Sequence, residues 1–183
     1  MDVHQIESVA AQYPACLRER LGADVPPELS ALGNLDLLAL PKTALFCSSR
    51  CPGKVILTTY DQAARWRDAD RCVISGFHSP VEKECLKILL RGDAPVILCP
   101  AHSMLERLPA QWAIAVAGGR MLILSCFPKT DRRVTTDLAA RRNDFVAALA
   151  DEVFIAHATP GGRMERLAKR LEQQRCPTTC LAK

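Results

Sequence analysis

The sequence predicts an α/β fold: a doubly wound, mostly parallel sheet of about six strands, Rossmann-like, with a short N-terminal helical appendage. Short apolar runs recur from Thr43 onward, and they are almost continuously apolar, as strands covered on both faces are. Amphipathic stretches with helical spacing separate them, and this alternation indicates right-handed crossovers and a parallel sheet. The predicted strands are "TALFCSS" (43–49), "RCVISG" (71–76), "PVILCP" (95–100), "MLILSCF" (121–127), "EVFIAHA" (152–158) and "PTTCLA" (177–182).

Length and composition indicate one globular domain. The chain has 183 residues, 49% of them hydrophobic and 24% charged, which is enough to bury a real core. The net charge of +4 permits an anionic ligand without requiring nucleic acid. We find no membrane span and no export signal, so we expect a cytoplasmic protein with reduced thiols.

The first part of the chain is punctuated by proline. Pro14 and Pro27 suit the first turns of short helices, which we expect over about 14–21 and 27–32. The stretch "LGNLDLLAL" (32–40) predicts an edge strand. We therefore divide the chain into residues 1–42, an N-terminal helical appendage and edge strand, and residues 43–183, the Rossmann-like domain.

Three longer helices are expected between the later strands. In "SPVEKECLKILLRG" (79–92), Ser79 can cap the helix, Pro80 suits its first turn and Gly92 ends it. We expect Glu82 and Glu84 on this helix to face solvent or to pair with nearby lysines. The other two helices lie within 135–152 and 161–174.

Polar and glycine residues follow several of the predicted strands. In doubly wound folds ligands bind outside the carboxyl ends of the strands, and glycine-rich turns into helices cradle phosphate. Each of these features has a structural explanation when taken alone: the Gly-Gly pair can be an ordinary turn, an arginine can lie on a solvated helix face, and the histidine can be packed. Together they predict one anionic or nucleotide site built from Ser48, Ser49, Arg50, Ser75, Gly76, Phe77, His78, Ser79, Arg142, Asn143, Pro160, Gly161, Gly162 and Arg163.

The nine cysteines and the absence of several known motifs limit the kinds of site that the chain can form. Most cysteines lie in apolar runs, where we expect buried thiols, while a redox or metal role for the pairs Cys47/Cys51 and Cys176/Cys180 stays open. The sequence lacks G-x-G-x-x-G after the first strand, a P-loop and G-x-S-x-G. We expect no cofactor and no bound metal.

The order of short motifs resembles the DNA-processing protein A (DprA/Smf) family over most of the chain. "YPACL" and "GNLDLL" precede a strand ending in Ser48-Ser49-Arg50, where the family has Gly-Ser-Arg. Ser75-Gly76 matches the start of its "S-G-x-A-x-G-I-D" turn. "SCFP" (125–128) resembles "S-E-x-P", and "RNDFVAALA" (142–150) resembles "R-N-R-x-I-A-x-L-S".

The resemblance implies an extended Rossmann domain that binds single-stranded DNA and helps load a RecA-type recombinase in natural transformation. Family members commonly form homodimers. The implied DNA contacts are Arg50, Gly76, Arg142 and Asn143, and Phe77 or His78 would stack on a base, with Phe127 a further aromatic at the same edge.

Two other functions remain open. "TPGGRMERL" (159–167) resembles the "P-G-G-x-G-T-x-x-E" loop of LOG-type nucleotide phosphoribohydrolases, which cleave an N-glycosidic bond. An enzyme of that kind would use Arg142 and Glu165 as its catalytic pair, with Glu82 and Glu84 as alternative carboxylates. The same cradle would also serve a sensor that binds a nucleotide-derived ligand.

Overall fold

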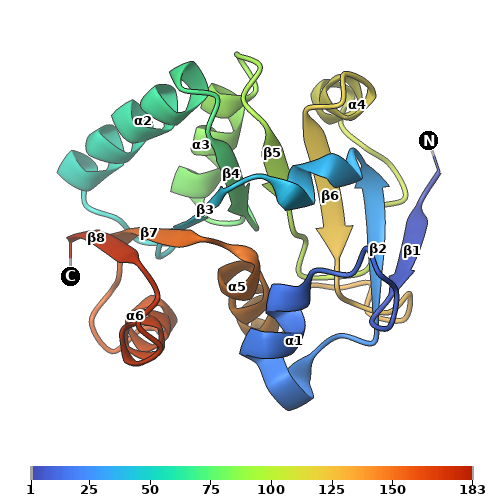
Figure 1. Ribbon diagram of the computed structural model, residues 1–183. Helices are drawn as coiled ribbons and strands as arrows, with labels where there is room; N and C mark the ends of the chain where they lie inside the picture. The colour runs from blue at the N-terminus through green and yellow to red at the C-terminus, as the bar shows by residue number, and fades with distance from the viewer. Residues whose placement is uncertain (1, 183) are drawn as a thin grey trace.

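The computed structural model describes residues 2–182, which form a single eight-stranded sheet with the order β1-β2-β6-β5-β4-β3-β7-β8 (Figure 1). Strands β3 to β8 are parallel, and each arises from one of the six predicted apolar runs, so those six predictions are confirmed. The strands are β1 (His4–Glu7), β2 (Glu28–Gly33), β3 (Lys42–Phe46), β4 (Cys72–Ser75), β5 (Val96–Leu98), β6 (Met121–Ser125), β7 (Glu152–His157) and β8 (Thr178–Ala182).

Helices cover both faces of the sheet. Figure 1 shows α2 (Gly53–Asp68), α3 (Pro80–Leu89) and α4 (Ala110–Ala117) on one face, with α1 (Ala15–Leu21), α5 (Thr136–Leu149) and α6 (Arg163–Gln173) on the other. Alternate residues of β7 serve the two cores: Val153 and Ile155 belong to one, Phe154 and Ala156 to the other. Burial on both faces explains the continuous apolar runs.

The N-terminal segment differs from its prediction. The helix over 14–21 is confirmed, but the helix over 27–32 is wrong, because these residues form β2. Strand β2 pairs antiparallel with β6 and with β1, so it covers an edge that would otherwise be exposed. The strand expected in 32–40 is also wrong: after Gly33 come the 3-10 helix η2 (Leu35–Ala39) and its Asn34 cap, whose side chain accepts from the Asp36 N–H at 3.0 Å. A further 3-10 turn, η1 (Gly22–Asp24), follows α1.

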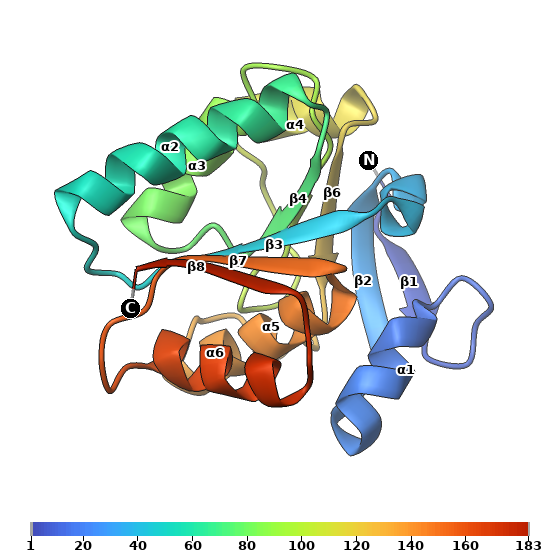
Figure 2. The same ribbon diagram turned by 60° about the vertical axis from the view of Figure 1, so that its left-hand side comes forward.

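Between β3 and β7 the order in which the chain adds strands to the sheet reverses, from one side of β3 to the other. The two strands are neighbours in the sheet, but the chain leaves β3 through α2 on one face and leaves β7 through α6 on the other. In Figure 2 the loops that follow these two strands lie together at one edge of the molecule. Such a switch point is where doubly wound proteins bind their ligands.

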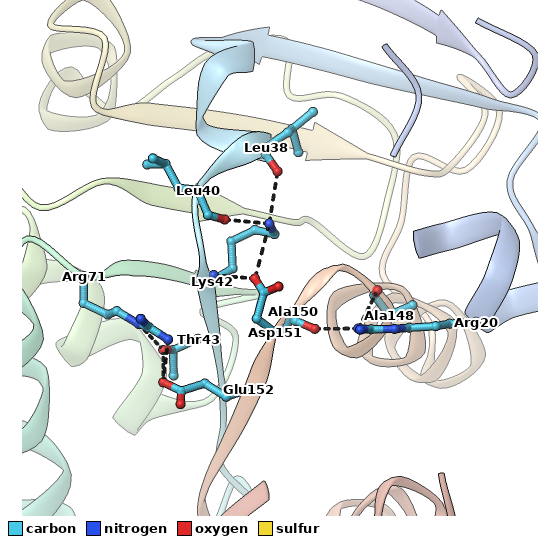
Figure 3. Close-up of polar contacts among 10 residues, drawn as sticks. All are labelled: Arg20, Leu38, Leu40, Lys42, Thr43, Arg71, Ala148, Ala150, Asp151 and Glu152. Atoms are coloured by element: carbon cyan, nitrogen blue, oxygen red, sulfur yellow. Dashed lines mark hydrogen bonds and ion pairs between the residues drawn. The ribbon is translucent and has the colours of Figure 1, made fainter. Parts of the chain in front are cut away.

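The opposite, amino-terminal edge of β3 and β7 carries a buried lysine, Lys42, and two ion pairs whose other members are partly exposed (Figure 3). Lys42 is 6% exposed, and its Nζ donates to the carbonyls of Leu38 at 3.0 Å and Leu40 at 2.7 Å, with Asp151 3.5 Å away. Alongside it, Arg71 Nη2 donates to Glu152 at 2.8 Å. These groups satisfy one another, so this edge is structural.

Candidate functional site

The segments that follow β3, β4 and β7 form one continuous edge, which we call the carboxyl rim. The Ser48 N–H donates to the His157 carbonyl at 2.9 Å, and the Thr159 N–H donates to Ser48 Oγ at 3.0 Å. These two bonds join the carboxyl end of β3 to that of β7. The segments after β3 and β7, two of those from which the site was predicted, are therefore in direct contact.

Glu82 joins the ends of β3 and β4. It is only 5% exposed, and its Oε1 accepts the Cys47 N–H at 2.8 Å. Its Oε2 accepts the His78 N–H at 2.8 Å and the Ser79 N–H at 3.1 Å, while Ser79 Oγ accepts the Glu82 N–H in return. The expectation that Glu82 faces solvent is wrong, because its carboxylate satisfies backbone donors that the strand ends and the start of α3 leave open. The companion expectation for Glu84 is confirmed, since it pairs with Lys87 at 2.7 Å.

Arg142 places a buried positive charge beneath the rim. Its side chain comes from α5, its Nη1 donates to the Cys99 carbonyl at 3.0 Å, and its Nε donates to Asn143 Oδ1 at 2.8 Å. A Cβ atom on Gly76 would lie 1.2 Å from Arg142 Nη1, so only glycine leaves room for the guanidinium here. Burial lowers the pKa of Arg142, and the nearby Glu82 carboxylate opposes that shift.

Several predicted side chains are accessible on the rim. Ser49, Arg50, His78 and Arg163 are exposed. Partial desolvation of its ring, and then the charge of Arg142, lower the pKa of His78 from its usual value, so the ring favours the neutral form. Cationic and neutral hydrogen-bonding groups thus face solvent together at the switch point.

Other residues of the predicted site are buried and contact protein groups instead of solvent. Ser75 Oγ donates to the Leu45 carbonyl at 2.7 Å and accepts the Phe77 N–H at 3.1 Å, and the Ser79 hydroxyl caps α3. Phe77 and Phe127 are each 4% exposed, so the prediction that they offer a ring to a base is contradicted by their burial. Phe77 also has φ of +45°, an uncommon conformation for a bulky residue, which turns its ring into the core.

The loop after β7 prepares the start of α6. Gly161 has φ of +70°, and its N–H donates to Glu165 Oε2 at 2.9 Å, while the Gly162 N–H donates to the Thr159 carbonyl at 2.9 Å. Pro160 is exposed beside them, and Arg163 Nη2 reaches Thr136 Oγ1 at 3.2 Å. Glu165, the alternative catalytic carboxylate, therefore holds its own loop and also lies 3.5 Å from Lys169.

Two residues at the rim, Glu82 and His157, were not among the binding residues predicted from the sequence. The Ser79-x-x-Glu82 pattern is that of a capping box and could have located Glu82. His157 ends β7 with a buried Nδ1 that has no hydrogen-bond partner among residues 2–182. No local pattern distinguishes His157, because its position next to Ser48 depends on strand pairing. A buried polar atom without a partner at a switch point is where a ligand would donate or accept a hydrogen bond.

The sequence model of the family described as DNA recombination-mediator protein A matches residues 4–175. This chain belongs to the DNA recombination-mediator protein A family. No curated protein sequence matches it.

Solved structures share the fold. DNA processing protein A from Streptococcus pneumoniae aligns with a TM-score of 0.80 at 19% identity, over 98% of this chain and 63% of that one. DNA processing protein A from Helicobacter pylori, described with a single-stranded DNA binding mode, aligns with a TM-score of 0.76 at 21% identity, over 98% and 80%. A molybdenum cofactor binding protein from Rippkaea orientalis aligns with a TM-score of 0.53 at 12% identity, over 78% of this chain and 77% of that one. The chain thus spans less than two thirds of the S. pneumoniae structure. At these identities the likeness establishes the fold.

Among residues 2–182, no helix is both long and apolar enough to cross a bilayer.

Proposed function

We propose that this protein binds single-stranded DNA at the carboxyl rim and acts in DNA uptake and processing, in natural transformation. Membership of the DNA recombination-mediator protein A family supports this proposal, as does the description of the H. pylori relative. The observation that carries it is the buried Arg142 guanidinium, held under Gly76 at the switch point, with exposed Arg50 on the same rim.

In this proposal the rim binds the phosphates of the strand. Arg50 and Arg163 are exposed cations that pair with phosphate oxygens, while Ser49 offers a hydroxyl donor. The charge of Arg142 adds to the positive potential from below. His78 is the one predicted stacking residue that is exposed, so backbone contacts supply most of the affinity and base identity matters little.

The test is binding of a fluorescein-labelled oligo-dT, measured by anisotropy over a range of salt concentrations. Affinity should fall with salt, with a slope in log units of about −0.7 for each phosphate neutralised. The Arg50→Ala variant should bind more weakly and lose about 0.7 of that slope. The matched control is Arg91→Ala, which removes an exposed arginine that follows α3 at the opposite edge of the sheet.

Two outcomes would refute the proposal. One is no binding of the oligonucleotide at low salt. The other is equal loss of affinity in the Arg50 and Arg91 variants, because that would indicate diffuse charge attraction rather than a rim site.

The family resemblance extends the proposal to a homodimer in the cytoplasm that passes the bound strand to a RecA-type recombinase. Light scattering on the eluting peak tests the dimer. Formation of recombinase filaments on oligonucleotide coated with a single-strand binding protein, with and without this protein, tests the transfer.

A further inference from the structure

Two thiols meet at the base of the loop that carries the candidate site. Cys47 follows β3 and is 5% exposed, and Cys51 is half-buried just before α2. The chain bends at Ser49 and Arg50, which brings Cys51 back onto the same hydrophobic core as Cys47. Both are free thiols, and Cys51 lies close enough to Cys47 to raise the pKa of the Cys47 thiol. The Cys51 thiol itself donates to the Pro52 carbonyl at 3.8 Å.

Sequence spacing alone does not produce this contact. Cys176 and Cys180 have the same spacing, but Cys180 lies on the extended strand β8. Four residues of extended chain span about 13 Å, whereas the Cα atoms of a disulfide lie less than about 7 Å apart. The bend at Ser49 and Arg50 is therefore what brings Cys47 and Cys51 near each other in space.

The two thiols differ in a way that suits stepwise chemistry. Burial, and then the neighbouring Cys51, raise the pKa of Cys47, so Cys47 favours the protonated thiol. Cys51 is half-buried whereas Cys47 is only 5% exposed, so a small disulfide in solution reaches the Cys51 sulfur first. Cys51 is thus the attacking thiol and Cys47 the resolving one.

We propose that Cys47 and Cys51 are a redox-active dithiol that low-molecular-weight disulfides, such as glutathione disulfide, convert reversibly into an intramolecular disulfide. Cys51 loses its proton and attacks one sulfur of glutathione disulfide, which releases one glutathione as its thiol. Cys47 then loses its proton and attacks Cys51 Sγ in the mixed disulfide, which releases the second glutathione thiol. Two protein thiols are oxidised and one glutathione disulfide is reduced, and the two protons end on the two glutathiones.

If the rim binds DNA as proposed above, the disulfide would weaken that binding. The residues it encloses are Ser48, Ser49 and Arg50, and the Cys47 N–H is already fixed by Glu82. A bond of about 2.05 Å between the sulfurs draws Cys51 toward the strand end, because Cys47 cannot move out to meet it. Arg50, next to Cys51, is pulled inward with it, so the oxidised protein should bind oligo-dT about tenfold more weakly, which corresponds to about 1.4 kcal/mol.

The first test is chemical and does not depend on DNA. The full chain is equilibrated in glutathione redox buffers, the remaining thiols are alkylated, and disulfides are mapped by mass spectrometry. We expect a Cys47–Cys51 disulfide that dithiothreitol reverses. Cys51→Ser should abolish it, Cys47→Ala should stop at a glutathione adduct on Cys51, and the control Cys180→Ser should leave it intact. Circular dichroism confirms that each variant is folded.

The outcomes separate this inference from the proposed function. The dithiol proposal is overturned if folded protein forms no Cys47–Cys51 disulfide, or if the half-buried cysteines Cys16, Cys51, Cys176 and Cys180 are all alkylated equally. A disulfide that leaves oligonucleotide affinity unchanged overturns control of the rim but leaves DNA binding standing. If neither redox form binds DNA while the disulfide forms, the proposed function fails and the dithiol stands.

Discussion

Replacing Glu82 by Gln tests whether one buried carboxylate organises the carboxyl rim. The carboxylate accepts three backbone N–H groups, those of Cys47, His78 and Ser79. A glutamine has one oxygen, so its NH₂ group must face a backbone donor on one side. A hydrogen bond to a charged group contributes about 1.5–3 kcal/mol, and a buried donor left without a partner adds to the loss. We expect the free energy of unfolding to fall by about 2–4 kcal/mol.

The measurement is urea unfolding followed by circular dichroism. With a slope of about 2 kcal/mol per molar urea, the midpoint should fall by about 1–2 M. The matched control is Glu84→Gln on the same helix, which breaks only the surface pair with Lys87 and should change stability by less than about 0.5 kcal/mol. If the two variants unfold at the same urea concentration, the carboxylate does not hold the rim together. The Glu82 variant should also bind oligo-dT more weakly.

Further variants at the rim and at the opposite edge of the sheet, together with a pH titration of His78, give the remaining predictions. Gly76→Ala should displace the Arg142 guanidinium and lower oligonucleotide affinity about tenfold. This loss should vanish in an Arg142→Ala background, and Gly53→Ala, with no atom within 4 Å of its new Cβ, should have no effect on binding. Lys42→Met leaves two buried carbonyls without their donor and removes the ion pair with Asp151, so the free energy of unfolding should drop by about 2–4 kcal/mol while affinity stays unchanged. The lowered pKa of His78 means that the unfolded chain binds a proton more readily. Its contribution to stability should therefore decline as pH falls below about 6.5, and bound phosphate should raise the pKa seen by NMR.

The local pattern of the sequence determined the parallel part of the fold. Six apolar runs became β3 to β8, and β3 to β7 are apolar because both of their faces are buried, whereas β8 is the more exposed edge strand. Ser79 and Pro80 marked the start of α3 because capping is a local interaction. The gathering of Ser48, Gly76 and Gly161 at one edge followed from strand polarity alone.

Only the tertiary structure decided the rest. Residues 28–33 became a strand because β6 offered an open edge, which no local signal reports. Phe77 turned inward, Glu82 was buried and Arg142 settled under Gly76 because each depends on groups distant in the sequence. Whether two cysteines of equal spacing touch was likewise decided by the path of the chain, a bend in one case and an extended strand in the other. Side-chain exposure and contact are properties of the packed chain, and they determine which residues of the rim can reach a ligand.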